Sequence, residues 1–229
     1  MSPTFACLQL FQALGRATLT AVGAVVAPSS CAGCEAPTRR ATIFCGGCAA
    51  TLVRHQPEEH PSLGRLLGFA AYGGAVAAAV RRFKYDGRSD LALPLGHAVR
   101  RAVREHALDL GVDWVVPVPL HPLRLAERGY NQSALIARHV AVELAADFQL
   151  GLRRTRDTAP QAQRPFGERL ENVAQAFGAS PSAAGRRIAL VDDVATTCAT
   201  LEACAEAFRR RGARVVAAIV VARAIVDRD

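Results

Sequence analysis

Beyond residue 65, segments with helical spacing of apolar residues alternate with short segments that are apolar throughout. The helical spacing predicts helices over residues 75–84, 91–106, 131–146 and 201–211. The short apolar segments predict buried strands over residues 114–119, 187–191 and 215–221. This alternation is typical of an α/β domain, in which helices cover both faces of an open and mainly parallel sheet.

Two polar stretches interrupt the pattern. Residues 49–65 contain Pro57 and Pro61 on either side of acidic residues, and we expect them to form a linker. Residues 153–176 are rich in arginine and glutamine and have little periodicity, which predicts a long loop.

Residues 1–27 carry an apolar face that includes Leu8, Phe11 and Leu14, which predicts an amphipathic helix. No basic residue precedes Arg16, whereas a secretion signal begins with a basic segment. A membrane span needs about 18 or more consecutive apolar residues, and the chain has no such run. We therefore expect a cytoplasmic protein that does not insert into a membrane.

Four of the seven cysteines form two C-x2-C pairs separated by ten residues: Cys31, Cys34, Cys45 and Cys48. This spacing predicts a zinc ribbon over residues 28–56 with a structural Zn²⁺, because four thiolates leave no coordination position for a substrate. The alternatives are a pair of redox motifs or a vestigial ribbon. We expect loss of one thiolate to loosen this segment and to spare the rest of the chain.

The amino-acid composition excludes one class of protein and indicates the charge of the partners. A hydrophobic fraction of 51% over 229 residues supports a packed core and excludes a largely disordered chain. Lys84 is the only lysine among 28 lysine and arginine residues, a bias that genomic base composition explains. The net charge of +8 predicts anionic partners such as nucleotides, pyrophosphate or nucleic acid.

Residues 188–200 form the segment most informative about chemistry, I-A-L-V-D-D-V-A-T-T-C-A-T. An apolar strand ends in Asp192 and Asp193, and a turn of small residues leads into a helix. Hydroxyls and successive N–H groups at a helix N-terminus bind phosphate, whereas the carboxylates suit a neutral diol. The segment therefore suggests a sugar phosphate, and the alternative is an ordinary strand end before a Thr-capped helix. Because adjacent carboxylates repel each other, we expect neither to stabilise the fold.

This segment resembles the phosphoribosyl diphosphate (PRPP) motif of type I phosphoribosyltransferases, in which glycine commonly stands at the position of Cys198. Four further motifs extend the resemblance: F-K-Y at 83–85, V-V-P-V-P-L-H-P-L-R-L-A-E-R-G-Y-N-Q at 115–132, R-T-R-D-T-A-P-Q at 154–161 and R-L-E-N-V at 169–173. Together with the four-cysteine segment, they make the chain similar to the ComF family of competence-associated proteins from about residue 28 to 224.

The resemblance implies a type I phosphoribosyltransferase-like domain over residues 62–229, preceded by the zinc ribbon. It implies that Asp192 and Asp193 are the catalytic residues that bind the ribose hydroxyls. The residues implied to hold the 5′-phosphate are Ala195, Thr196, Thr197, Cys198, Ala199 and Thr200. The candidates for contact with diphosphate or nucleic acid are Lys84, Arg124, Arg128, Asn131 and Gln132. Asn131 and Gln132 could orient the loop; equally, Asn131 could cap the following helix.

Two functions follow from the resemblance. The first is a PRPP-binding protein of DNA uptake and natural transformation, which with Mg²⁺ transfers a phosphoribosyl group and releases diphosphate. The alternative is a non-catalytic competence factor that binds single-stranded DNA, in which the PRPP-like site is regulatory or vestigial. Other competence proteins are further expected partners.

Overall fold

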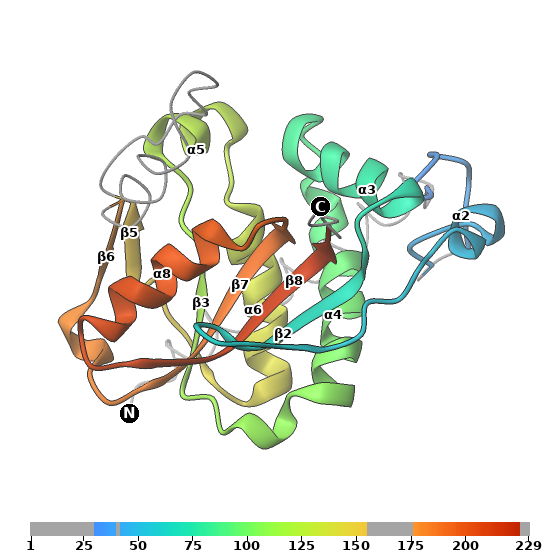
Figure 1. The fold of residues 1–229 in the computed structure, drawn as a ribbon. Helices are drawn as coiled ribbons and strands as arrows, with labels where there is room; N and C mark the ends of the chain where they lie inside the picture. Colours follow the sequence, from blue (N-terminus) through green and yellow to red (C-terminus); the bar gives the residue numbers. More distant parts are fainter. Residues whose placement is uncertain (1–29, 40–41, 155–175, 225–229) are drawn as a thin grey trace, which may run out of the picture.

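The computed structural model describes residues 30–39, 42–154 and 176–224 (Figure 1). The helix expected over residues 1–27 lies outside these ranges, as do residues 155–161 and 169–173 of the two polar motifs. Among the described helices, none is both long enough and apolar enough to cross a membrane.

A six-stranded sheet with the order β1-β2-β8-β7-β3-β4 forms the centre of the fold. Its strands are β1 (Glu58–His60), β2 (Gly64–Ala71), β3 (Trp114–Pro117), β4 (Asp147–Phe148), β7 (Arg187–Ala195) and β8 (Arg214–Arg223). β1 is antiparallel to β2, and all other neighbouring strands are parallel. In β8 every residue from Val215 to Ala222 is buried, because a central parallel strand is covered on both faces. The expected mainly parallel α/β sheet is confirmed.

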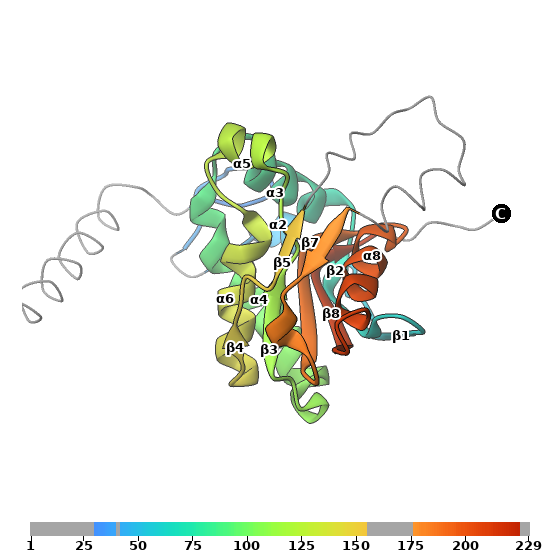
Figure 2. The ribbon, with the colours of Figure 1, turned by 90° about the vertical axis from the view of Figure 1, so that its left-hand side faces the viewer.

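Helices cover both faces of this sheet, as Figure 2 shows. One face carries α3 (Gly74–Tyr85), α4 (Ala92–His106) and α6 (Gln132–Leu144), and the other carries α8 (Ala199–Arg209). The smaller elements are α2 (Gly46–Ala50), α5 (Pro122–Arg128), the 3-10 turns η1 (Ser89–Leu91), η2 (Leu108–Leu110) and η3 (Pro181–Ala183), and a two-stranded sheet of β5 (Leu152–Arg154) and β6 (Phe177–Ala179). The four long helices and three buried strands expected from periodicity are confirmed to within a few residues.

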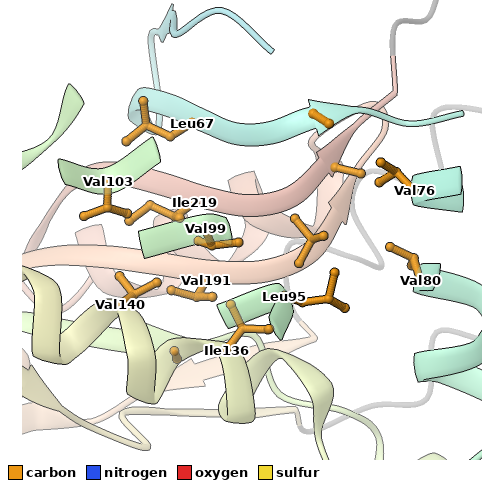
Figure 3. Close-up of a cluster of buried hydrophobic side chains, with 14 of the residues drawn as sticks. Leu67, Val76, Val80, Leu95, Val99, Val103, Ile136, Val140, Val191 and Ile219 are labelled. Atoms are coloured by element: carbon orange, nitrogen blue, oxygen red, sulfur yellow. The ribbon is translucent and has the colours of Figure 1, made fainter. Parts of the chain in front are cut away.

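The two faces of the sheet have separate cores. Figure 3 shows the larger one, in which Val191 and Ile219 of the sheet lie among side chains of α3, α4 and α6. On the opposite face, Leu190 and Val220 pack with Phe208 of α8. Successive residues of β7 thus alternate between the two cores.

β1 and α5 were not predicted from the sequence pattern because they bury few side chains, and β2 was not among the expected strands although Leu66, Leu67 and Ala70 are buried. The stretch expected to be a linker contributes β1, whose polar residues lie at the sheet edge and pair with β2, for example Glu58 with Leu66. Helix α5 has no buried residue and therefore no apolar periodicity, although the sequence suggested only a basic loop there. Its boundaries are set instead by a His121 N-cap, Pro122 in the first turn and a left-handed Gly129 at the end.

The cysteine segment packs directly against α3. Cys31, Ala32 and Phe44 belong to the same buried cluster as Val76 of α3. A Cβ on Gly33 would lie 2.9 Å from both the Ala75 Cβ and the Cys48 Sγ, so this approach requires glycine. The described part of this segment therefore shares the core of the α/β domain.

A second close approach, between α4 and α6, gives a test of the fold. A Cβ on Gly96 would lie only 2.6 Å from Cγ of His139. Alanine usually stabilises a helix interior by about 0.5–1 kcal/mol relative to glycine. Here we expect the opposite: Gly96→Ala lowers the free energy of unfolding by about 1–3 kcal/mol through overpacking.

Chemical denaturation measures this change. In the His139→Ala background, Gly96→Ala is expected to lose most of its cost, because the overlapping ring is gone. An equal cost in both backgrounds would contradict the described packing of α4 on α6.

Candidate functional site

The four cysteines expected to bind zinc converge in space. Their Sγ atoms all lie within 4.8 Å of one another, and those of Cys34 and Cys45 are 3.6 Å apart. Tetrahedral Zn²⁺ with Zn–S bonds of about 2.3 Å separates its sulfurs by about 3.8 Å. Burial opposes ionisation of Cys31, but backbone N–H groups of Cys45, Cys34 and Gly33 outweigh it and lower the pKa of this thiol to about 6. The donor set and its spacing fit a structural zinc ion.

Asp193, at the carboxyl end of β7, is buried with only 3% of its surface exposed. Its Oδ1 lies 2.6 Å from Nζ of Lys84 on α3, and its Oδ2 accepts a hydrogen bond from the side-chain amide of Gln132 on α6. Burial disfavours the charged ammonium, yet the charges of Asp193 and Asp192 raise the pKa of Lys84 above its usual value. Lys84 and Gln132, which were expected to contact diphosphate or nucleic acid, therefore bind the Asp193 carboxylate in this structure.

Asp192, the residue before Asp193 in β7, has a different set of partners. Its Oδ1 accepts hydrogen bonds from Oγ of Ser133 at 2.9 Å and from the Asp193 N–H at 2.8 Å. Burial and the charge of Asp193 raise the pKa of Asp192 to about 7, although both hydrogen bonds and Lys84 act in the opposite direction. Asp192 is more exposed than Asp193 and is therefore the carboxylate more open to a ligand.

Asn131 organises the N-terminus of α6 beside these acids. Its side-chain oxygen accepts from the N–H groups of Ser133 and Ala134, and its amide donates to the Val118 carbonyl at 3.0 Å. Asn131 thus caps the helix and also ties it to the end of β3. Ser133 was not among the residues expected at the site, although its position in the first turn after the Asn131 cap was a usable signal.

The segment after the acids forms a tight loop into α8. Cys198 is the N-cap of α8 and has a left-handed backbone with φ of +66°, a conformation that favours glycine. Thr196, Thr197 and Thr200 are exposed around it. Since the first N–H groups of a helix have no partner within the helix, this end of α8 can bind an anion such as phosphate.

Arg223, which the sequence did not suggest, supports this loop from the end of β8. Its Nη1 donates to the carbonyls of Ala195 and Thr196 and, at 2.8 Å, to that of Ala224. The side chain is only 17% exposed. Arg223 reaches the loop because β7 and β8 pair with Ala195 opposite Arg223, a register that only the assembled sheet defines.

The remaining expected contacts lie on or after α5. Nη1 of Arg128 donates to the side-chain oxygen of Gln132 and thereby joins the network around Asp193. The guanidinium of Arg128 also lies 5.4 Å from the centroid of the exposed Tyr85 ring. Arg124 is exposed, and among the described residues no contact joins it to either acid. Figure 1 shows α5 beyond the carboxyl end of β3.

Comparisons with known proteins show which proteins this chain is similar to. A family model described as "Phosphoribosyl transferase domain" matches residues 124–229, which include both acids and the loop. Competence protein F of Haemophilus influenzae is 29% identical over 208 residues, which cover 85% of this chain and 90% of that protein. DNA utilization protein YhgH of Escherichia coli K12 is 30% identical over 191 residues, which cover 81% and 80%. The protein of the same name from Salmonella typhimurium is 30% identical over 193 residues, which cover 82% and 81%.

The left-handed backbone of Cys198 predicts an unusual order of stability between two variants. An L-residue in this conformation is disfavoured by about 1–2 kcal/mol, a cost that glycine avoids. We therefore expect Cys198→Gly to be more stable than Cys198→Ala by about 1 kcal/mol in urea unfolding. At an exposed site within α8, the alanine variant should be more stable than the glycine variant. A Cys198→Ala variant more stable than Cys198→Gly would contradict the left-handed backbone of this loop.

The two acids are expected to affect stability with opposite signs. Asp192 has a pKa of about 7 in the folded state and about 3.9 when unfolded, so the wild-type protein loses stability as pH rises between these values. At pH 8, Asp192→Asn should be about 1–4 kcal/mol more stable than wild type, and this gain should vanish near pH 4. Asp193→Asn removes the partner of Lys84 and should instead be about 1–3 kcal/mol less stable.

Urea unfolding of both variants at pH 4, 6 and 8 measures these differences. Stabilisation by both substitutions would contradict the role of Asp193 as an ion-pair partner. A gain from Asp192→Asn that does not change with pH would contradict the raised pKa of Asp192.

Proposed function

The chain belongs to the family of competence protein F and DNA utilization protein YhgH, and on this premise we propose that it binds PRPP, or a related sugar phosphate, and acts in DNA uptake and natural transformation. The observation that carries the proposal is the juxtaposition of the Asp192 and Asp193 carboxylates with the left-handed loop and the N-terminus of α8. Carboxylates accept hydrogen bonds from a diol, and N–H groups at a helix N-terminus bind a phosphate.

In this proposal Asp192 and Asp193 have different tasks. Asp192, being more exposed, accepts the ribose hydroxyls first. Asp193 is already bound by Lys84 and Gln132, so it fixes the position of these two side chains and shares its carboxylate with the ligand. Thr196, Thr197 and Thr200, with the N–H groups of residues 198–200, hold the 5′-phosphate.

Phosphoribosyl transfer is the reaction that this site suits. The bond between the ribose C1′ and the diphosphate oxygen breaks, positive charge develops on the ribose, and the diphosphate leaves with the bonding electrons. An acceptor nucleophile then forms the new bond to C1′ with its own electron pair. Carboxylates that bind the ribose hydroxyls stabilise the developing cation, and cations nearby stabilise the leaving group. Lys84 binds Asp193, and Arg128 binds Gln132 beside it, so these two cations could contact the leaving group. Mg²⁺ bound with PRPP would neutralise part of the diphosphate charge.

The zinc site completes the proposal. Four cysteine thiolates would hold Zn²⁺ in a structural role, and thiolates of this kind persist in a reducing compartment, so we place the protein in the cytoplasm.

Single-stranded DNA is a second candidate ligand. Arg128 stacks over Tyr85, whose side chain is 71% exposed, and Arg124 lies on the exposed surface of α5. An exposed aromatic ring beside arginines is a surface on which bases stack while phosphates are neutralised. In this case the sugar-phosphate site would regulate binding or would be vestigial.

Calorimetry with PRPP and Mg²⁺ tests the first function. Asp192→Asn removes a charge-assisted acceptor worth about 1.5–3 kcal/mol, so we expect PRPP to bind about 10- to 150-fold more weakly. The double variant with Asp193→Asn should lose about two to three orders of magnitude. Asp109→Asn, which removes an exposed carboxylate paired with Arg65 on another part of the chain, is the matched control and should bind as wild type does.

The same variants separate the two functions. If DNA binds through Arg124, Arg128 and Tyr85, the acid variants should keep their affinity for a single-stranded oligonucleotide, and its binding should weaken steeply with salt. Absence of PRPP binding by the wild-type protein, or equal binding by Asp192→Asn, would contradict the proposed sugar-phosphate site. Release of diphosphate from PRPP by the wild-type protein would establish turnover.

A further inference from the structure

Helix α3 lies between the cysteine cluster and the proposed sugar-phosphate site. Its first turn carries Ala75, against which Gly33 of the first cysteine pair packs. Its last turn carries Lys84, which binds Asp193. Figure 1 shows α3 between α2, which belongs to the cysteine segment, and the sheet. One helix therefore contacts both sites.

Arg82 makes the contact between the last turn of α3 and the cysteine cluster. Its Nη1 donates to the Ala32 carbonyl at 3.0 Å and to the Gly33 carbonyl, both of which lie between Cys31 and Cys34. Its Nη2 lies 3.4 Å from the Glu35 carboxylate, and the side chain is only 20% exposed. Metal binding is coupled to the folding of the segment that carries the metal ligands. The Ala32 and Gly33 carbonyls, which lie between two of the cysteines, are therefore held in place best when the thiolates hold an ion.

Lys84 is two residues further along the same turn. Residues two apart on an α-helix project about 200° from each other, so Arg82 and Lys84 extend from nearly opposite sides of α3. Between them, Phe83 is fully buried, and its carbonyl accepts a hydrogen bond from the Tyr130 hydroxyl. A shift of this turn that follows loss of the Arg82 contacts would move Lys84 relative to Asp193.

Because residue 84 is a lysine, a shift of the last turn of α3 would weaken its interaction with Asp193. Lys84 is the only lysine among 28 lysine and arginine residues, and its ammonium is a compact charge on one oxygen of Asp193. An ammonium of this kind does not have the planar fork by which arginine can bind two oxygens at once. The interaction therefore depends on where α3 places the Nζ atom.

We propose that Arg82 is a positioning residue that couples the metal-binding cysteine cluster to the sugar-phosphate site. Metal in the cluster strengthens the binding of PRPP, and PRPP in turn strengthens the binding of the metal, because coupling between two sites is reciprocal. The inference rests on the proposed function, since it takes PRPP as the ligand at Asp192 and Asp193.

The test uses the full chain loaded with Co²⁺, whose thiolate absorption bands report that the four-cysteine site is formed. Arg82→Ala is compared with Arg81→Ala, which removes an exposed arginine from the same turn of α3. We expect Arg82→Ala to bind PRPP with Mg²⁺ about tenfold more weakly, within the roughly 5- to 150-fold range of couplings between sites. Arg81→Ala should bind within about twofold of wild type.

A second measurement follows the release of Co²⁺ to a chromogenic chelator. PRPP should slow this release by about tenfold in the wild type and in Arg81→Ala, but not in Arg82→Ala. Arg82→Lys keeps a donor to the Ala32 carbonyl and should restore part of the effect. A purely structural role of Arg82 would change the rate of release without removing its dependence on PRPP.

Three other outcomes would overturn the inference, and they can be told apart. A wild-type protein that binds PRPP but releases Co²⁺ equally fast with and without it has no coupling, whatever the variants do. Coupling that persists in Arg82→Ala would show that Arg82 does not transmit it. Failure of the wild-type protein to bind PRPP at all would overturn the proposed function first, and the inference with it.

Discussion

The geometry at the carboxyl edge of the sheet depends on the ion pair between Lys84 and Asp193. A carboxylate that is only 3% exposed needs a compensating charge and hydrogen-bond donors. Lys84 brings the end of α3 to this carboxylate, and Gln132 brings the first turn of α6. Three segments that are distant in the sequence therefore converge on one side chain, and the more open Asp192 is held beside them.

The loop that follows the acids is held in a conformation that its sequence does not favour. Cys198 occupies a left-handed backbone position, and strain of this kind is found at ligand sites where the surrounding structure enforces it. Arg223 supplies that enforcement by binding the carbonyls of Ala195 and Thr196 from the neighbouring strand. The carbonyls of Ala195 and Thr196 are thus bound by the protein itself. The N–H groups at the start of α8 can bind an anion, although that of Ala199 also lies 3.5 Å from Oγ1 of Thr197.

The cysteine segment is a part of this architecture and is not simply attached to it. Gly33 fits between Ala75 and the Cys48 sulfur, and Cys31 lies in the core that α3, α4 and α6 form with the sheet. Since α3 carries Arg82 toward the cysteines and Lys84 toward Asp193, the two sites share one rigid element. This arrangement gives a physical reason to doubt the expectation that disturbing the cysteines would spare the rest of the chain.

The sequence by itself determined the α/β class, the four long helices, the buried strands β3, β7 and β8, and the convergence of the four cysteines. These features leave a local signal, because a strand buried on both faces must be apolar and a metal knuckle needs fixed spacing. Only the tertiary structure decided that Ser133 binds Asp192, that Lys84 and Gln132 bind Asp193, and that Arg223 supports the loop. It also decided that β1 and α5 form. Polar pairs between distant segments and elements without buried side chains produce no periodicity, so strand register and helix packing alone bring their residues together.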